Sequence, residues 1–119
     1  MYHKKMHEFP VTEQIIKIAA EQAEKNNALK VTQINLVVGE SSGFIGESIQ
    51  MYFDIISEGT ICKGAILKME NVKTKWKCPA CDILYSRQPL SFACPNCGMD
   101  GLPTEIGREF YVQSIEIET

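Results

Sequence analysis

The chain has 119 residues, of which 45% are hydrophobic and 23% are charged, so its composition is that of a globular protein and excludes a disordered one. This length suits one ordinary domain, or a small core joined to a metal-stabilised module. The formal net charge of -3 argues against nucleic acid as the default partner, because phosphate groups favour a basic surface.

The sequence carries neither a membrane-spanning stretch nor a recognisable export signal. No run approaches the roughly 20 apolar residues that span a bilayer. The first residues, "MYHKKMHEFPVTE", do not lead into the apolar stretch of a secretory signal. Two pairs of closely spaced cysteines in such a chain point to metal binding before disulfides. We therefore predict a cytoplasmic protein that does not bind membranes.

The first half of the chain predicts a helix, a strand and a second helix. The first helix is expected to run from a cap at Thr12 to about Asn26, with apolar residues at helical spacing. The segment "VTQINLVV" alternates and is rich in β-branched residues, so it predicts a strand. After the loop "GESSGFIG", a second helix places Ile49 and Phe53 on its buried side and ends at Gly59.

Two further strands are predicted in the second half. The segment "AILKMENV" is strand-like, but past Asn71 the apolar residues move from odd to even positions, which indicates a bulge or a module boundary. The last segment, "REFYVQSIEIE", is again strand-like, with Tyr111, Ile115 and Ile117 expected on one side.

A cysteine-rich segment lies between these last two strands, so the simplest layout inserts a small module into one sheet. We predict an α+β fold, in which a three-stranded sheet and two helices form an α/β domain from residues 1–75 and 108–119. Residues 76–107 are expected to form an inserted, zinc-ribbon-like domain.

Four cysteines, Cys78, Cys81, Cys94 and Cys97, form two CPxC turns that twelve residues separate. Two such turns can present four thiolates to one ion, and a tetrahedral set of four sulfurs is typical of a closed structural zinc site. Iron accepts the same ligands in a rubredoxin-like site and is the main alternative. A redox-active dithiol is less favoured, because a catalytic CxxC normally occurs singly at a helix N-terminus. The fifth cysteine, Cys62, is expected to be a small buried hydrophobic residue.

The two histidines, His3 and His7, both lie close to the start of the sequence. A terminal amine, backbone amide nitrogens and an imidazole can together chelate one ion. Such a nitrogen set suits square-planar Ni(II) or Cu(II) better than tetrahedral zinc. Chelation of this kind requires histidine at the second or third position of the mature chain.

Several motifs, taken in order, resemble the HypA/HybF family of hydrogenase maturation factors. They are Met6-His7-Glu8, "INLVVGE", "EGTICKGAIL", the paired CPxC turns and the closing "SIEIE", and they run from Met6 to about Glu118. The resemblance implies a nickel metallochaperone, not an enzyme, with an N-terminal nickel site on an α/β domain and an inserted zinc domain. Its implied partners are a HypB-type nickel GTPase, the large-subunit precursor of [NiFe]-hydrogenase and, in some organisms, urease maturation proteins.

The resemblance also implies which residues bind each metal. His7 would be the nickel-binding imidazole, with Glu8 beside it as a further ligand or a tuning group and Met6 as the family's first residue. The four paired cysteines would hold zinc. Glu40 matches a recurrent acidic position at the end of a strand, but we do not predict it to be a ligand.

The sequence departs from the family pattern at its start, because Met-Tyr-His-Lys-Lys precedes Met6. Translation in the cell that starts at Met6 would restore the family's chelating terminus. Alternatively, Met1-Tyr2-His3 is itself an amine–amide–imidazole chelator. We favour the first hypothesis, since His7 and Glu8 keep the family context.

One other class of function, a zinc-ribbon interaction module, is kept as the alternative, and an enzyme is weighed against it. The paired CPxC turns and the basic cluster at Lys73, Lys75 and Lys77 also occur in zinc-ribbon modules that bind nucleic acid or proteins without nickel cargo. An enzyme is not expected, since the sequence offers no catalytic set of residues and no GxxxxGK[ST] loop for nucleotide hydrolysis. The sequence is compatible with a monomer or a homodimer.

Overall fold

The computed structural model describes the backbone of residues 4–119 and the side chains from Glu8 onward. The chain folds into two compact units. The first, the α/β unit, contains the chain up to Val37 together with Phe44–Glu70 and Tyr111–Thr119. The second, the cysteine unit, contains Val38–Gly43 and Asn71–Phe110.

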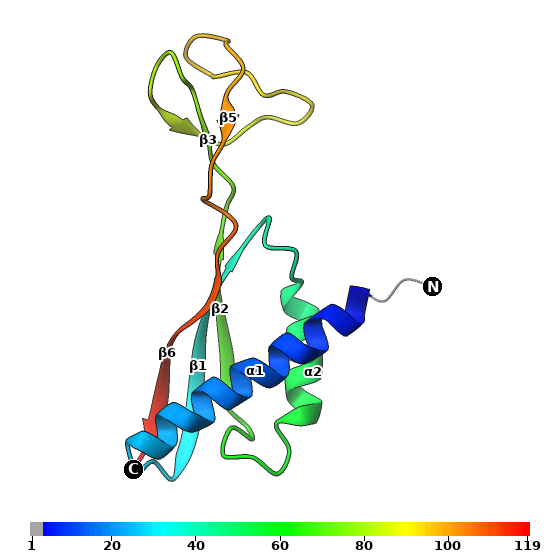
Figure 1. Ribbon diagram of the computed structural model, residues 1–119, viewed down its shortest axis with the longest axis vertical. Coiled ribbons are helices and arrows are strands. Elements are labelled where there is room, and N and C mark those ends of the chain that lie inside the picture. The colour runs from blue at the N-terminus through cyan, green and yellow to red at the C-terminus, as the bar shows by residue number, and fades with distance from the viewer. Residues whose placement is uncertain (1–3) are drawn as a thin grey trace. The chain divides into compact units, whose positions relative to one another are not determined.

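The helices and strands follow the predicted order along the chain. They are α1 (Lys4–Lys25), β1 (Lys30–Gly39), α2 (Gly46–Ile56), β2 (Ile66–Val72), β3 (Trp76–Lys77), β4 (Leu84–Tyr85), β5 (Leu102–Pro103) and β6 (Phe110–Glu118) (Figure 1). The described strands form two three-stranded sheets, one in the order β2-β1-β6 and the other in the order β4-β3-β5. The predicted α+β class, with two helices and a three-stranded sheet, is confirmed.

Helix α1 begins well before the predicted start, and the prediction that Thr12 caps it is wrong. Thr12 is fully buried inside the helix, and its Oγ1 donates a hydrogen bond to the carbonyl oxygen of Glu8 at 2.6 Å. A threonine hydroxyl can either cap a helix or bond the carbonyl four residues back, and the sequence alone does not distinguish these roles. Pro10 also lies within α1.

The core of the α/β unit is formed by the apolar sides of α1, β1 and α2. Ala19 and Ala23 of α1, Ile34 of β1 and Ile49 of α2 are fully buried, and Phe53 of α2 is 1% exposed. The buried positions of the two helices fit the helical spacing expected from the sequence, whereas in β1 the consecutive residues Leu36, Val37 and Val38 are all buried, which departs from the expected alternation. Burial of such side chains is the main stabilising contribution to a unit of this kind.

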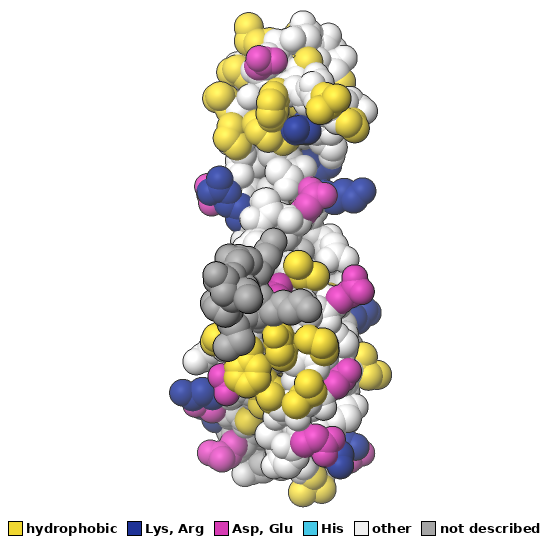
Figure 2. Space-filling view, turned by 90° about the vertical axis from the view of Figure 1, so that its right-hand side faces the viewer, with side chains coloured by type: hydrophobic (Ala, Val, Ile, Leu, Met, Phe, Trp, Pro, Cys, Tyr) yellow, Lys and Arg dark blue, Asp and Glu magenta, His cyan; other side chains and the backbone are white. Residues whose placement is uncertain are grey.

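On the outer sides of the α/β unit, burial follows the sequence pattern less closely than in the core. On α2, Met51 and Ile55 are exposed, and Figure 2 shows hydrophobic side chains gathered on this side of the unit. In β6, Ile115 and Ile117 are half-buried, whereas Tyr111 is exposed, so the three residues expected on one side of the strand are not equally buried. Burial in β6 changes from even to odd positions after Val112, which periodicity over a short segment does not reveal.

Within the described residues, neither helix is long and apolar enough to cross a membrane.

Candidate metal centre

Four sulfur atoms of the cysteine unit converge at one point. The Sγ atoms of Cys78, Cys81, Cys94 and Cys97 all lie within 4.8 Å of one another. Cys78 and Cys94 are buried, Cys81 is partly buried and Cys97 is exposed, so the cluster has one solvent-facing side. These are the four residues that the spacing of the CPxC turns singles out.

The two CPxC turns have the same backbone hydrogen bonds. In the first turn, the N–H of Asp82 donates to the carbonyl oxygen of Cys78 at 2.8 Å, and the N–H of Cys78 donates to that of Ile83 at 3.0 Å. In the second turn, the N–H of Gly98 donates to the carbonyl oxygen of Cys94 at 2.8 Å. Gly98 has a positive φ of 81°, and Asp82 occupies the equivalent position at 59°. Glycine adopts this left-handed conformation without steric cost, whereas aspartate adopts it less readily.

Each of the four sulfurs accepts a hydrogen bond from nitrogen. The backbone N–H groups of Cys81, Asn96 and Met99 donate to the sulfurs of Cys78, Cys94 and Cys97 at 3.3, 3.4 and 3.5 Å, respectively. The fourth sulfur, that of Cys81, is bonded by the side-chain Nδ2 of Asn96 at 3.2 Å. Donors of this kind stabilise thiolates and hold them in the orientation that a metal requires.

The thiols of the cluster differ in acidity. The N–H of Cys81 lowers the pKa of Cys78 to about 7. The N–H of Met99 favours the Cys97 thiolate, but the sulfurs of Cys78, Cys81 and Cys94 outweigh it and raise the pKa of Cys97 to about 12. Four thiolates this close repel one another, so the cluster is suited to a cation that balances their charge.

Little besides the cluster is buried in the cysteine unit. Its core consists of Cys78, Cys94 and Tyr85, with Trp76 and Cys81 packed against them. A core in which two of three buried residues are cysteines of the cluster is too small to stabilise a unit by packing alone. The donor set and the small core both fit a structural metal ion.

The predicted nickel residues lie at the edge of the described structure or beyond it. Met1 and His3 lie outside the described residues, as do the side chains of Met6 and His7. Glu8 is described, and its side chain is buried.

The carboxylate of Glu8 binds the start of α2. Its Oε2 accepts a hydrogen bond from the backbone N–H of Ile45, the N-cap residue of α2, at 2.6 Å. The side chain of Ile45 cannot cap a helix, and Glu8 supplies from α1 the acceptor that a capping-box glutamate would supply from within α2. Within the described part of the chain, Oε1 of Glu8 is buried without a hydrogen-bond partner.

Comparison with known proteins identifies the family. A family model described as hydrogenase/urease nickel incorporation, metallochaperone, HypA matches residues 6–117. The chain therefore belongs to the HypA family. Among HypA-family relatives, the hydrogenase maturation factor of Caldanaerobacter subterraneus subsp. tengcongensis is 41% identical over 114 residues, which cover 95% of this chain and 100% of that protein. The factor of Aquifex aeolicus is 34% identical over 115 residues, covering 95% and 98% of the two chains.

Solved HypA structures have the same fold. A solution structure of a HypA protein superposes with a TM-score of 0.69 at 28% identity, covering 94% of this chain and 96% of that one. The solution structure of the nickel metallochaperone HypA from Helicobacter pylori gives a TM-score of 0.61 at 26% identity, covering 93% and 97%. The likeness to HypA and the four-cysteine cluster together confirm the predicted fold class, including its zinc-ribbon-like module.

Glu40, the acidic residue that follows β1, has a local partner. Oε1 of Glu40 accepts a hydrogen bond from the backbone N–H of Thr74 at 2.9 Å. This bond lowers the pKa of Glu40, with a smaller contribution from the charge of Lys73. Glu40 thus stays ionised and joins the end of β1 to the segment after β2, a role that requires no metal.

Asn96 is the residue of the centre that sequence reasoning missed. We expect Asn96→Ala to weaken metal binding by the four-cysteine cluster about five- to tenfold, because it removes the side-chain donor to Cys81 from a partly exposed site. Competition with a coloured chelator on the purified protein measures this. Asn71→Ala, an exposed asparagine of the same unit, is the matched control and should retain the parent affinity. Equal zinc release from both variants would show that the Asn96 bond does not stabilise the centre.

Proposed function

We propose that this chain is a nickel metallochaperone that binds Ni(II) near its N-terminus and holds a structural zinc ion in its cysteine unit. With a HypB-type GTPase, it would deliver nickel to the large-subunit precursor of [NiFe]-hydrogenase, with the urease maturation proteins as further partners. The match of residues 6–117 to a nickel-incorporation family supports this proposal most directly. The chain would act by binding and release, without catalysis of its own, in the cytoplasm.

Zinc is the resident metal that best fits the four-cysteine cluster. Four sulfur donors around one point suit a closed tetrahedral site, in which no position is left for a substrate. When bound, zinc would supply the charge that lets all four thiols ionise and would tie the two CPxC turns together. Iron is the competing metal, and the absence of colour in purified, metal-loaded protein would separate zinc from iron.

The proposed nickel ligands are His7 and Glu8, with Met6 as the first residue of the ligand set and His3 and Met1 as the alternative. His7 lies in the first turn of α1, which begins at Lys4, and this is where a helix has backbone N–H groups without an acceptor inside the helix. Glu8 is anchored by its bond to the N–H of Ile45, which favours a tuning role for its carboxylate over direct ligation. The bond to Ile45 holds Glu8, the residue immediately after His7, in place.

Nickel titration of two chains tests which terminus binds the cargo. A chain that begins at Met6 should bind one Ni(II) with a square-planar absorption spectrum, and His7→Ala in that chain should lower its affinity at least tenfold, because the imidazole ligand is lost. In the chain that begins at Met1, His3→Ala and His7→Ala distinguish the two ligand sets. Calorimetry and visible absorption measure both effects.

The same assay separates the carrier proposal from its alternatives. Glu8→Gln keeps an oxygen acceptor for Ile45 and should lower nickel affinity less than His7→Ala does. If neither histidine variant changes nickel uptake, the proposed site is wrong. Delivery is then tested by incubating nickel-loaded protein with the GTPase and the nickel-free hydrogenase precursor, and by measuring nickel in the precursor.

A further inference from the structure

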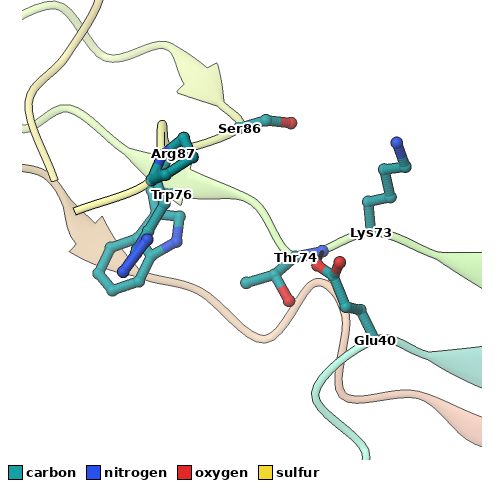
Figure 3. A pocket seen from close by; sticks show the side chains of 7 residues that line it. Glu40, Lys73, Thr74, Trp76, Ser86 and Arg87 are labelled. Atoms are coloured by element: carbon teal, nitrogen blue, oxygen red, sulfur yellow. Dashed lines mark hydrogen bonds between the residues drawn. The ribbon is translucent and has the colours of Figure 1, made fainter. Parts of the chain in front are cut away.

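The cysteine unit contains an open pocket that the metal centre does not use. It has a volume of about 530 Å³ and is lined by Glu40, Lys73, Thr74, Trp76, Ser86, Arg87 and Pro89 (Figure 3). Figure 3 shows Lys73 and Arg87 extending from different segments, with Thr74 and Glu40 between them. Trp76 is the single tryptophan of the chain. A pocket of this size suits a few residues of a peptide or a small ligand.

The cations around this pocket differ from the other cations of the unit. Among the described residues, Lys77 pairs with Asp82 at 2.9 Å and Arg108 pairs with Glu105 at 3.3 Å. Arg87, in contrast, has no carboxylate partner in the described chain, and its guanidinium lies 4.5 Å from the centroid of the Phe92 ring.

Two lysines add to the positive charge near Arg87. The Nζ of Lys75 donates to the hydroxyl of Ser86 at 2.9 Å, which holds an ammonium group beside the pocket lining without neutralising it. Lys73 interacts with the charge of Glu40 but forms no ion pair among the described residues. Since Glu40 balances one of the two cations that line the pocket, Lys73 and Arg87, the lining keeps an excess of positive charge, to which Lys75 beside it adds.

The aromatic rings favour a peptide over a nucleotide as the ligand. The rings of Trp76 and Phe92 pack against each other with centroids 4.9 Å apart and planes tilted by 55°, and Arg87 covers Phe92. Both rings are thus engaged within the unit, so they do not offer a free slot in which a base could stack on both faces. Cations that come from separate segments also suit separate carboxylates better than one compact phosphate group.

We propose that this pocket docks an acidic segment of a partner protein. Two carboxylates of an extended peptide would bind the cations at Lys73 and Arg87, and an apolar side chain between them would contact the open edge of Trp76. Alternate side chains of an extended peptide point to the same side, so carboxylates two residues apart can both face the pocket. This docking would bring a partner to the cysteine unit and is independent of where nickel binds.

A synthetic peptide tests the proposal on the zinc-loaded full chain. The probe is N-acetylated, C-amidated Glu-Val-Glu-Val-Glu, and the same peptide with glutamine in place of glutamate is its control. Because Trp76 is the only indole, its fluorescence and its single indole N–H resonance report binding at the pocket. The acidic peptide should shift both signals, and its affinity should fall several-fold between about 0.01 M and 0.15 M salt, where the Debye length shortens from about 30 to 8 Å.

Matched variants locate the binding site. Lys73→Gln and Arg87→Gln should each weaken binding of the acidic peptide about two- to fivefold, which is the range of exposed ion pairs. Lys77→Gln removes a neighbouring lysine that is already paired with Asp82, and should leave binding unchanged. Zinc content and the folded resonances of each variant confirm that the unit is intact.

Three results would overturn the proposal. They are equal binding of the two peptides, equal loss in Lys77→Gln and Arg87→Gln, and a response of Trp76 to guanosine monophosphate but not to the acidic peptide, which would make the pocket a nucleotide site. Nickel titration of Arg87→Gln should match the parent chain. Failure of peptide docking therefore leaves the carrier proposal intact, and failure of nickel binding leaves the docking result intact.

Discussion

Cys94→Ser should unfold the cysteine unit and leave the α/β unit folded. Cys94 is both a member of the four-sulfur cluster and one of the few buried residues of its unit. Binding of structural zinc by small modules has an apparent free energy of about 10–16 kcal/mol, so a damaged site removes most of what holds the unit together. The α/β unit has a separate apolar core on α1, β1 and α2, and this core does not depend on the metal.

Native mass spectrometry and NMR measure the two halves of this result. The variant should lose zinc, and the indole N–H of Trp76 should move to the position of an unfolded tryptophan, while methyl resonances of the α/β core keep their dispersion. Cys62→Ala is the control, because Cys62 is buried outside the cluster and its loss should leave the zinc content unchanged. A folded cysteine unit in zinc-free Cys94→Ser would show that packing, and not metal, stabilises it.

The convergence of the four cysteines could be predicted from sequence because it is built from local repeats. Each CPxC turn brings two sulfurs together within four residues, and the second turn repeats the first, so spacing alone identifies all four cysteines. The sequence also shows that the two turns differ, as "CPAC" and "CPNC". It does not show that the amide of Asn96 reaches Cys81, fifteen residues away in sequence, because this contact depends on how the two turns face each other.

Contacts between distant segments could not be predicted in this way. The hydrogen bond from Ile45 to Glu8 joins residues 37 apart, and no pattern in either segment indicates it. The early start of α1 was missed because threonine is typical of a helix N-cap, whereas here the Thr12 hydroxyl bonds a carbonyl inside the helix. The pocket beside Trp76 likewise combines the end of β1 with the segments around β3 and β4.

Gly39→Ala should be among the most destabilising single substitutions in the chain. A Cβ at Gly39 would lie 2.1 Å from the carbonyl oxygen of Gly107 and 2.7 Å from the backbone nitrogen of Glu109. These backbones are held together by the hydrogen bond from the N–H of Gly39 to the carbonyl oxygen of Glu109 at 2.6 Å. Because the atoms in the way belong to the main chain and not to a flexible side chain, we expect a loss of about 3 kcal/mol or more in the free energy of unfolding.

Urea unfolding followed by circular dichroism measures this loss, and Gly43→Ala provides the comparison. Gly43 has a positive φ of 89° but nothing within 4 Å of its would-be Cβ, so its replacement introduces backbone strain without a clash. That strain costs about 1–2 kcal/mol. Gly39→Ala should therefore lose clearly more stability than Gly43→Ala, although Gly43 is the one of these two glycines that has a positive φ. If the two variants unfold at the same urea concentration, the close approach of the Gly39 and Gly107 backbones does not limit the fold, and the glycine in the "VVGE" motif must be explained by something other than packing.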